Sequence, residues 1–134
     1  MSATDLCRRR MRIIVVEDNR AAADSLGQLL GLHGYEVRLA HTGPEGVRLA
    51  QEWPADVVLC DLGLPRPDGY EVARQIRRQP GRRPVVIGIG DDYRARDLLK
   101  AREAGCDHFF AKPVDPDLLV PVLQAVQDGL PRSP

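Results

Sequence analysis

Short apolar runs alternate with amphipathic stretches five times along this chain, and that alternation constrains its fold more than any other feature. The run Ile13-Ile14-Val15-Val16 has no polar residue at alternate positions, which is typical of a strand buried on both faces of a parallel sheet. Gly31 and Gly34 are predicted to stop the first helix. Strands are predicted over residues 13–16, 35–40, 56–60, 85–89 and 108–111, and helices over 21–30, 44–51, 70–78, 95–104 and 116–128. This order predicts an α/β fold, with a parallel sheet between two layers of helices.

The length of 134 residues suits one such domain. Residues 11–130 are assigned to it, residues 1–10 are predicted to form a flexible N-terminal arm, and residues 131–134 a short tail. The 19 basic and 19 acidic side chains cancel, which disfavours a general nucleic-acid binder. No apolar run approaches the roughly 20 residues of a membrane span, and the N-terminus lacks the apolar core of a signal peptide. A cytoplasmic location without membrane contact is therefore expected.

Several common functional motifs are missing from the sequence. The three cysteines are widely spaced and form no C-x-x-C pair, which excludes a disulfide scaffold, disfavours a zinc site and predicts reduced thiols. Residues 88–93 begin like a dinucleotide fingerprint but lack its third glycine. Neither a Walker-A motif nor a G-x-S-x-G elbow occurs.

Charged side chains follow the ends of several predicted strands. Glu17 and Asp18 follow the first strand, Asp61 the third and Lys112 the fifth. The ligand site of an open doubly wound sheet lies beyond the carboxyl ends of its strands, so these groups are expected to meet. Three acids at one edge repel one another unless a cation such as Mg²⁺ neutralises them. Asp61 is a candidate nucleophile toward phosphorus, with Lys112 stabilising the transferred charge. The alternative is that all four are ordinary polar residues at strand ends.

Seven short motifs extend this pattern across most of the chain, from about residue 12 to 127. Together they resemble one known family, the receiver (response regulator) domain of bacterial two-component signalling, which is CheY-like. The stretch around Asp61 is similar to receivers associated with hybrid sensor kinases. The resemblance implies a flavodoxin-like (βα)5 sandwich with sheet order 2-1-3-4-5. The motifs are Val15-Val16-Glu17-Asp18-Asn19, Gly34-Tyr35-Glu36-Val37, residues 54–61, Leu64-Pro65, Asp68-Gly69-Tyr70-Glu71-Val72, Ala104-Gly105 and Lys112-Pro113.

The resemblance also implies a role for each charged residue. Asp61 would accept a phosphoryl group from a phosphohistidine, so the implied partner is a sensor histidine kinase or a histidine phosphotransfer protein. Glu17, Asp18, Asp61 and the backbone carbonyl of Gly63 would hold Mg²⁺, and Lys112 would pair with a phosphoryl oxygen. The domain would assist its own phosphorylation, without turning over a small-molecule substrate, and would signal by protein contact as a monomer or weak dimer. The Lys112–Pro113 bond is expected to be cis.

Two positions depart from the family pattern. The family carries Thr or Ser at the end of the fourth strand, where this chain has Ile89. Ile has no hydroxyl, so one hydrogen bond to the phosphoryl group, worth about 1.5–3 kcal/mol, is lost. The switch aromatic three residues before the lysine is often Tyr in the family and is Phe109 here. We therefore expect phosphorylation of Asp61 with a weak or altered conformational response.

Two other functions remain as alternatives. The first is a pseudo-receiver, a protein-binding module that keeps the fold and is never phosphorylated; Ile89 favours it, whereas the retained Glu17, Asp18, Asp61 and Lys112 oppose it. The second is a small flavodoxin-like enzyme or cofactor carrier. It would need a loop rich in Ser, Thr and Gly, but no Ser or Thr occurs between Thr42 and Ser133.

Overall fold

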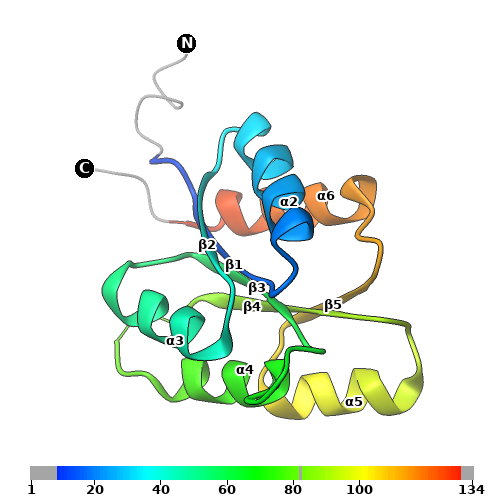
Figure 1. The fold of residues 1–134 in the computed structure, drawn as a ribbon. Helices are drawn as coiled ribbons and strands as arrows, with labels where there is room; N and C mark the ends of the chain where they lie inside the picture. Colours follow the sequence, from blue (N-terminus) through cyan, green and yellow to red (C-terminus); the bar gives the residue numbers. More distant parts are fainter. Residues whose placement is uncertain (1–8, 82, 131–134) are drawn as a thin grey trace.

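The computed structural model describes residues 9–81 and 83–130 and contains one five-stranded sheet (Figure 1). Every neighbouring pair of strands is parallel, in the order β2-β1-β3-β4-β5. The strands are β1 (Arg12–Val16), β2 (Glu36–Ala40), β3 (Val57–Asp61), β4 (Val85–Gly90) and β5 (His108–Ala111). The helices are α2 (Arg20–Leu32), α3 (Gly43–Glu52), α4 (Gly69–Arg78), α5 (Ala95–Ala104) and α6 (Pro116–Asp128).

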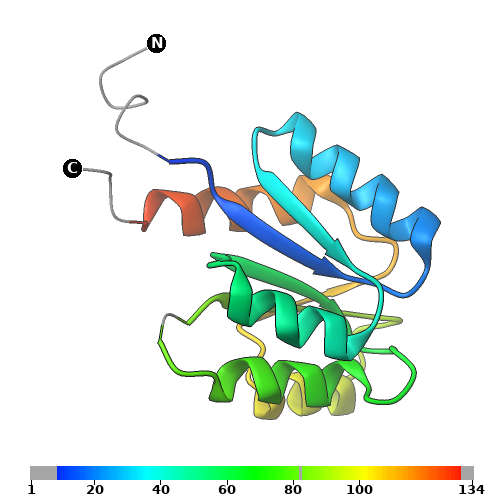
Figure 2. The ribbon, with the colours of Figure 1, turned by 60° about the vertical axis from the view of Figure 1, so that its left-hand side comes forward.

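Helices cover both faces of the sheet, with α2 and α6 on one side and α3, α4 and α5 on the other (Figures 1 and 2). Alternate residues of β1 enter different cores. Ile13 and Val15 pack in the cluster that contains Leu30 of α2 and Leu119 of α6. Ile14 and Val16 pack in the cluster that contains Val72 and Ile76 of α4. Because both faces are covered, a strand without polar alternation can be buried along its whole length.

Side-chain caps fix where four of the five helices begin. A side-chain oxygen of each capping residue accepts a hydrogen bond from a backbone N–H of the first turn, satisfying a donor that the helix leaves unpaired. The capping residues are Asn19 for α2, Thr42 for α3, Asp68 for α4 and Asp115 for α6. Helix α5 starts after Arg94 without a side-chain cap and ends at Gly105, whose φ of 104° suits glycine.

Gly69 allows α4 to begin against the end of β3. A β-carbon at this position would lie 2.1 Å from the carbonyl oxygen of Asp61 and 2.4 Å from Cα of Leu62. Only a residue without a side chain can approach the backbone this closely. The start of α4 therefore packs directly beneath the segment that carries Asp61.

The N-terminal contacts begin before the predicted domain boundary at residue 11. Arg9 donates to both carboxylate oxygens of Asp56, at 2.8 and 2.6 Å, and its carbonyl accepts from Gln127 at 3.3 Å. Arg10 donates to the carbonyl of Gly34 at 3.0 Å. The rest of the predicted arm, residues 1–8, and the predicted tail, 131–134, lie outside the described residues. Among the described helices, none is both long and apolar enough to span a membrane.

Candidate functional site

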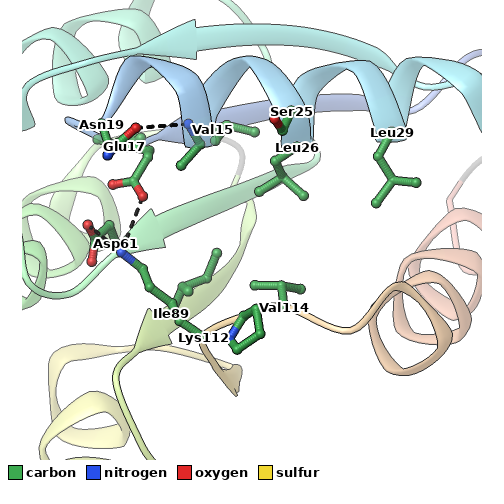
Figure 3. Close-up of a pocket in the computed structure, with 13 residues that line it drawn as sticks. Val15, Glu17, Asn19, Ser25, Leu26, Leu29, Asp61, Ile89, Lys112 and Val114 are labelled. Carbon is green, nitrogen blue, oxygen red and sulfur yellow. Dashed lines mark hydrogen bonds and ion pairs between the residues drawn. The ribbon is translucent and has the colours of Figure 1, made fainter.

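The charged residues predicted at the strand ends meet at the carboxyl edge of the sheet. Glu17 and Asp18 directly follow β1, Asp61 is the last residue of β3, and Lys112 directly follows β5. The Lys112 Nζ atom lies 3.1 Å from Oδ2 of Asp61 and 3.2 Å from Oε1 of Glu17 (Figure 3). One carboxylate oxygen from each of the three acids lies within 4.8 Å of the others. The sheet thus brings together four groups that are remote in sequence.

Burial and ion pairing give the two inner carboxyls different pKa values. Glu17 is 8% exposed, and its burial beside Asp61 raises its pKa to about 7. Burial opposes ionisation of Asp61 too, but hydrogen bonding with Glu17, the Gly63 N–H at 2.9 Å and Lys112 outweigh it and hold the pKa of Asp61 below its usual value. The same ion pairs outweigh the effect of burial on Lys112 and raise its pKa. Asp61 is therefore an ionised carboxylate at neutral pH.

The three acids fit a hard divalent cation. Oε2 of Glu17 is buried and has no hydrogen-bond partner among the described residues. An unsatisfied buried carboxylate oxygen is costly unless a cation or a proton neutralises it. Asp18 is exposed, so the cluster is open to solvent on one side. Mg²⁺ prefers such a site, in which a few carboxylates leave room for water and phosphate oxygens. Gly63 is held beside Asp61 by its N–H, and coordination through its carbonyl stays a prediction.

Ile89 lies next to Asp61 on the neighbouring strand. The two residues are register partners between β3 and β4, and the Ile89 carbonyl accepts from the Leu62 N–H at 2.8 Å. Ile89 is 6% exposed and lines the same pocket as Asp61 and Lys112 (Figure 3). An apolar side chain therefore occupies the position where the resemblance implies a hydroxyl.

Phe109 is on β5, opposite Gly88. Its ring lies against Gly90, because a β-carbon there would come within 2.7 Å of it. The ring meets Tyr93 edge-on, with the ring centres 5.7 Å apart. The switch position named from the sequence is thus half-buried beside the end of β4.

A mainly apolar pocket of about 620 Å³ extends from Asp61 toward α2. Leu26 and Leu29 of α2 and Val114 after β5 form its apolar wall (Figure 3). The sequence analysis did not identify this pocket. Leu26 and Leu29 lie three residues apart in the predicted helix over residues 21–30 and therefore share a face. The gap opposite Val114 depends on the path of the β5–α6 connection, which the sequence pattern does not predict.

The comparisons with known proteins agree with this geometry. The family model of the response regulator receiver domain matches residues 13–124. The chain belongs to the response regulator receiver family. Over 107 residues the receiver domain is 37% identical to response regulator MprA of Mycobacterium avium (strain 104), and 36% identical to MprA of Mycobacterium tuberculosis (strain ATCC 25618 / H37Rv). These matches cover 77% of the chain and 45% and 44% of the two relatives, so the chain spans less than half of their length.

Solved receiver structures have the same fold. A CheY-like receiver domain protein from Methanospirillum hungatei JF-1 is 29% identical with a TM-score of 0.80, over 90% of this receiver domain and 95% of that chain. The receiver domain of Ssk1 from Saccharomyces cerevisiae is 26% identical with a TM-score of 0.82, over 89% and 90%. That receiver was crystallised with the histidine phosphotransfer protein Ypd1.

Several predictions from the sequence are confirmed. The chain is a receiver domain of two-component response regulators with a flavodoxin-like α/β fold. The sheet order 2-1-3-4-5 is the one that the resemblance implied, and the Lys112–Pro113 bond is cis. A receiver domain is a signalling module, and its family typically binds Mg²⁺ at an acidic pocket such as the one formed here.

Proposed function

We propose that Asp61 is the phosphoacceptor of this receiver domain and takes a phosphoryl group from a phosphohistidine. The ion pair between Asp61 and Lys112, 3.1 Å long and beside two further carboxylates, carries this proposal. Asp61 is 5% exposed and ionised at neutral pH. The neighbouring ammonium group of Lys112 can pair with the negative charge of an incoming phosphoryl group. This combination suits nucleophilic attack at phosphorus.

The transfer exchanges one bond to phosphorus for another. A carboxylate oxygen of Asp61 attacks the phosphorus atom, and the P–N bond of the phosphohistidine breaks, leaving its electron pair on the imidazole nitrogen. Lys112, which now bridges Asp61 and Glu17, then pairs with an oxygen of the phosphoryl group. Glu17, Asp18, Asp61 and the Gly63 carbonyl would hold Mg²⁺, which when bound supplies positive charge against the acids and the phosphoryl oxygens.

The partner that we propose is a sensor histidine kinase or a histidine phosphotransfer protein. The likeness to a receiver crystallised with a histidine phosphotransfer protein supports this choice. We further propose that the domain acts in the cytoplasm as a monomer or weak dimer, assists its own phosphorylation rather than turning over a small molecule, and signals through protein contact.

Intact-mass spectrometry after incubation with acetyl phosphate or phosphoramidate tests the acceptor. We expect a single phosphoryl adduct with Mg²⁺, and none without Mg²⁺ or in Asp61→Asn. Asp24→Asn, an exposed acid on α2, is the matched control and should be phosphorylated normally. An adduct that persists in Asp61→Asn would contradict the assignment of the acceptor.

The pseudo-receiver remains a second candidate because Ile89 places an apolar side chain beside Asp61. Small-molecule donors alone do not separate the two functions, since a true receiver can require its own donor. A phosphorylated histidine phosphotransfer protein should transfer its group to the wild type within minutes. Failure with this donor as well, while calorimetry detects Mg²⁺ binding, would leave the pseudo-receiver as the function.

A further inference from the structure

A second hollow lies at the opposite edge of the sheet from Asp61 and is lined by the last turns of α4 and α5 and by residues just before β4 and β5. Its volume is about 670 Å³. Among the described residues that line it, only Glu103 and Asp107 are acidic. A chain with 19 basic and 19 acidic residues thus concentrates positive charge at one place. The basic side chains that line the hollow, called here the arginine hollow, are Arg74, Arg77, Arg78, Arg83 and Arg102.

Arg77 and Asp107 line the hollow, and their charged groups form hydrogen bonds with each other and with the surrounding backbone. The guanidinium group of Arg77 donates to the carbonyl of Gly105 at 2.8 Å, to the carbonyl of Pro84 at 3.1 Å and to the carboxylate of Asp107. Asp107 also accepts from the backbone N–H of Val86 at 2.9 Å. The charge of Asp107 is therefore neutralised by Arg77, so it does not offset the other arginines.

Arg78, Arg83 and Arg102 are exposed and form no ion pair with any described residue. Basic residues in the last turn of a helix are favoured by its dipole, which accounts for the presence of Arg78 and Arg102. The same effect does not account for Arg83, which lies in the loop before β4. Three guanidinium groups around one concave surface thus have no ion-pair partner among the described residues.

The arginine hollow continues into a neighbouring hollow of about 480 Å³ beside β5. The two share Arg102, Cys106 and Asp107 along their common border. The second hollow adds apolar side chains, including Leu98 and Phe109. The two adjoining hollows, called here the groove, suit an extended occupant better than a compact ion. Among the described residues no aromatic side chain lines the arginine hollow itself, so it lacks the aromatic platform on which the bases of single-stranded nucleic acids usually stack.

We propose that this groove binds an extended segment of a partner protein that carries consecutive acidic side chains next to an apolar one. The carboxylates pair with Arg78, Arg83 and Arg102, whose planar guanidinium groups can each hold a carboxylate by two parallel hydrogen bonds. The apolar side chain packs on Leu98 and Phe109. The arginine hollow lies at the opposite edge of the sheet from Asp61 and uses none of the proposed phosphoacceptor residues, so binding of the carboxylates there does not require phosphorylation. The apolar contact, in contrast, involves the switch position Phe109.

Fluorescence anisotropy with a labelled peptide tests the proposal. The probe is a run of glutamates followed by leucine, and the same peptide with glutamine in place of glutamate is the negative control. Arg78→Ala/Arg102→Ala should weaken binding about tenfold or more, a change equivalent to about 1.4 kcal/mol or more. Arg48→Ala/Arg96→Ala removes two exposed arginines elsewhere, with the same change in net charge, and should bind as the wild type does.

Three results would overturn the proposal. The first is an equal loss of affinity in the two double variants, which would indicate general charge attraction. The second is tighter binding of inorganic triphosphate or of single-stranded DNA at the same arginines. The third is a set of amide shifts, on adding the peptide, that maps outside α4, α5 and the start of β5. Shifts confined to those elements, together with the tenfold loss, would support it.

Discussion

Ile89 is the residue whose side chain most alters what the candidate site can do. A phosphoryl group on Asp61 would meet a methyl-rich surface at the neighbouring strand position instead of a hydrogen-bond donor. One hydrogen bond to a charged group is worth about 1.5–3 kcal/mol, which is enough to shift a two-state equilibrium by tenfold or more. We therefore propose that this one residue leaves phosphorylation of Asp61 intact but weakens the conformational response to it.

Replacing Ile89 by Thr should restore that response. We expect Ile89→Thr, once phosphorylated with Mg²⁺, to show amide shifts that spread along β4 and β5, whereas the wild type shows them only near Asp61. Ile89→Val is the matched control, because Val has nearly the shape of Thr but no hydroxyl. Ile89→Val should lose about 1 kcal/mol of stability from the smaller buried side chain. Ile89→Thr should lose more, because it also buries a hydroxyl group. Shifts that spread equally in Ile89→Val would contradict the role of the hydroxyl.

Glu17 should make stability depend on pH when divalent cations are removed. Its pKa is raised to about 7 in the fold, from an ordinary value of 4.5, so the folded state favours the protonated form. Stabilisation by that proton is complete below pH 4.5 and is lost as pH rises toward 7, by about 1–3 kcal/mol in total. Urea titrations in EDTA should show this loss in the wild type and not in Glu17→Gln. A flat profile in the wild type would contradict it.

At the level of the elements, most of the fold follows from residue patterns, and one helix end does not. Gly31 was predicted to stop the first helix, but α2 continues through it to Leu32, and the reversal occurs at Gly34, with a φ of 89°. Glycine costs a helix about 1 kcal/mol relative to alanine, which packing of Leu26 and Leu30 against the core can outweigh. A single stop signal is therefore weaker evidence than the apolar face around it.

Two glycines should respond in opposite ways to the same substitution. Gly69→Ala forces a β-carbon onto the backbone of Asp61 and Leu62, so we expect the free energy of unfolding to fall by more than about 2 kcal/mol. Gly31→Ala meets nothing within 4 Å in a helix, so stability should rise by about 0.5–1 kcal/mol. Urea denaturation monitored by circular dichroism measures both. A neutral Gly69→Ala would show that α4 can move away from β3.

For the whole molecule, the sequence predicted the layers, and it predicted the convergence of Asp61 and Lys112 because the ends of parallel strands meet at one edge. It could not predict the arginine hollow. Arg78, Arg83 and Arg102 come from two helix ends and a loop, and each resembles an ordinary surface residue. Nor could the sequence predict the ion pair between Arg9 and the buried carboxylate of Asp56, because nothing in the pattern of a basic N-terminal segment indicates which acid it will meet. Contacts that depend on the paths of loops cannot be predicted from the periodicity of apolar residues, because that periodicity describes only helices and strands.

Arg9 should matter to stability more than its neighbour does. The Arg9 side chain donates to the carboxylate of Asp56, ahead of β3. Among the described residues, the Arg10 side chain contacts only the backbone carbonyls of Gly34 and Tyr35. We expect Arg9→Gln to lower the free energy of unfolding by about 1–3 kcal/mol, and Arg10→Gln by less than about 0.5 kcal/mol. Thermal unfolding of the two variants side by side measures the difference. Equal losses would mean that the Arg9–Asp56 pair adds nothing specific.

The hydrogen bond between Gln127 and the Arg9 carbonyl has a consequence for protein engineering. It brings the first and last described segments of the chain together at the amino edge of the sheet, opposite the edge that carries Asp61. A domain whose two ends lie close together can be inserted into a loop of another protein without being stretched. Placed inside a fluorescent reporter, this receiver would be joined to the reporter at the edge opposite Asp61. A change at the proposed phosphoacceptor site would therefore have to be transmitted across the sheet to alter the fluorescence.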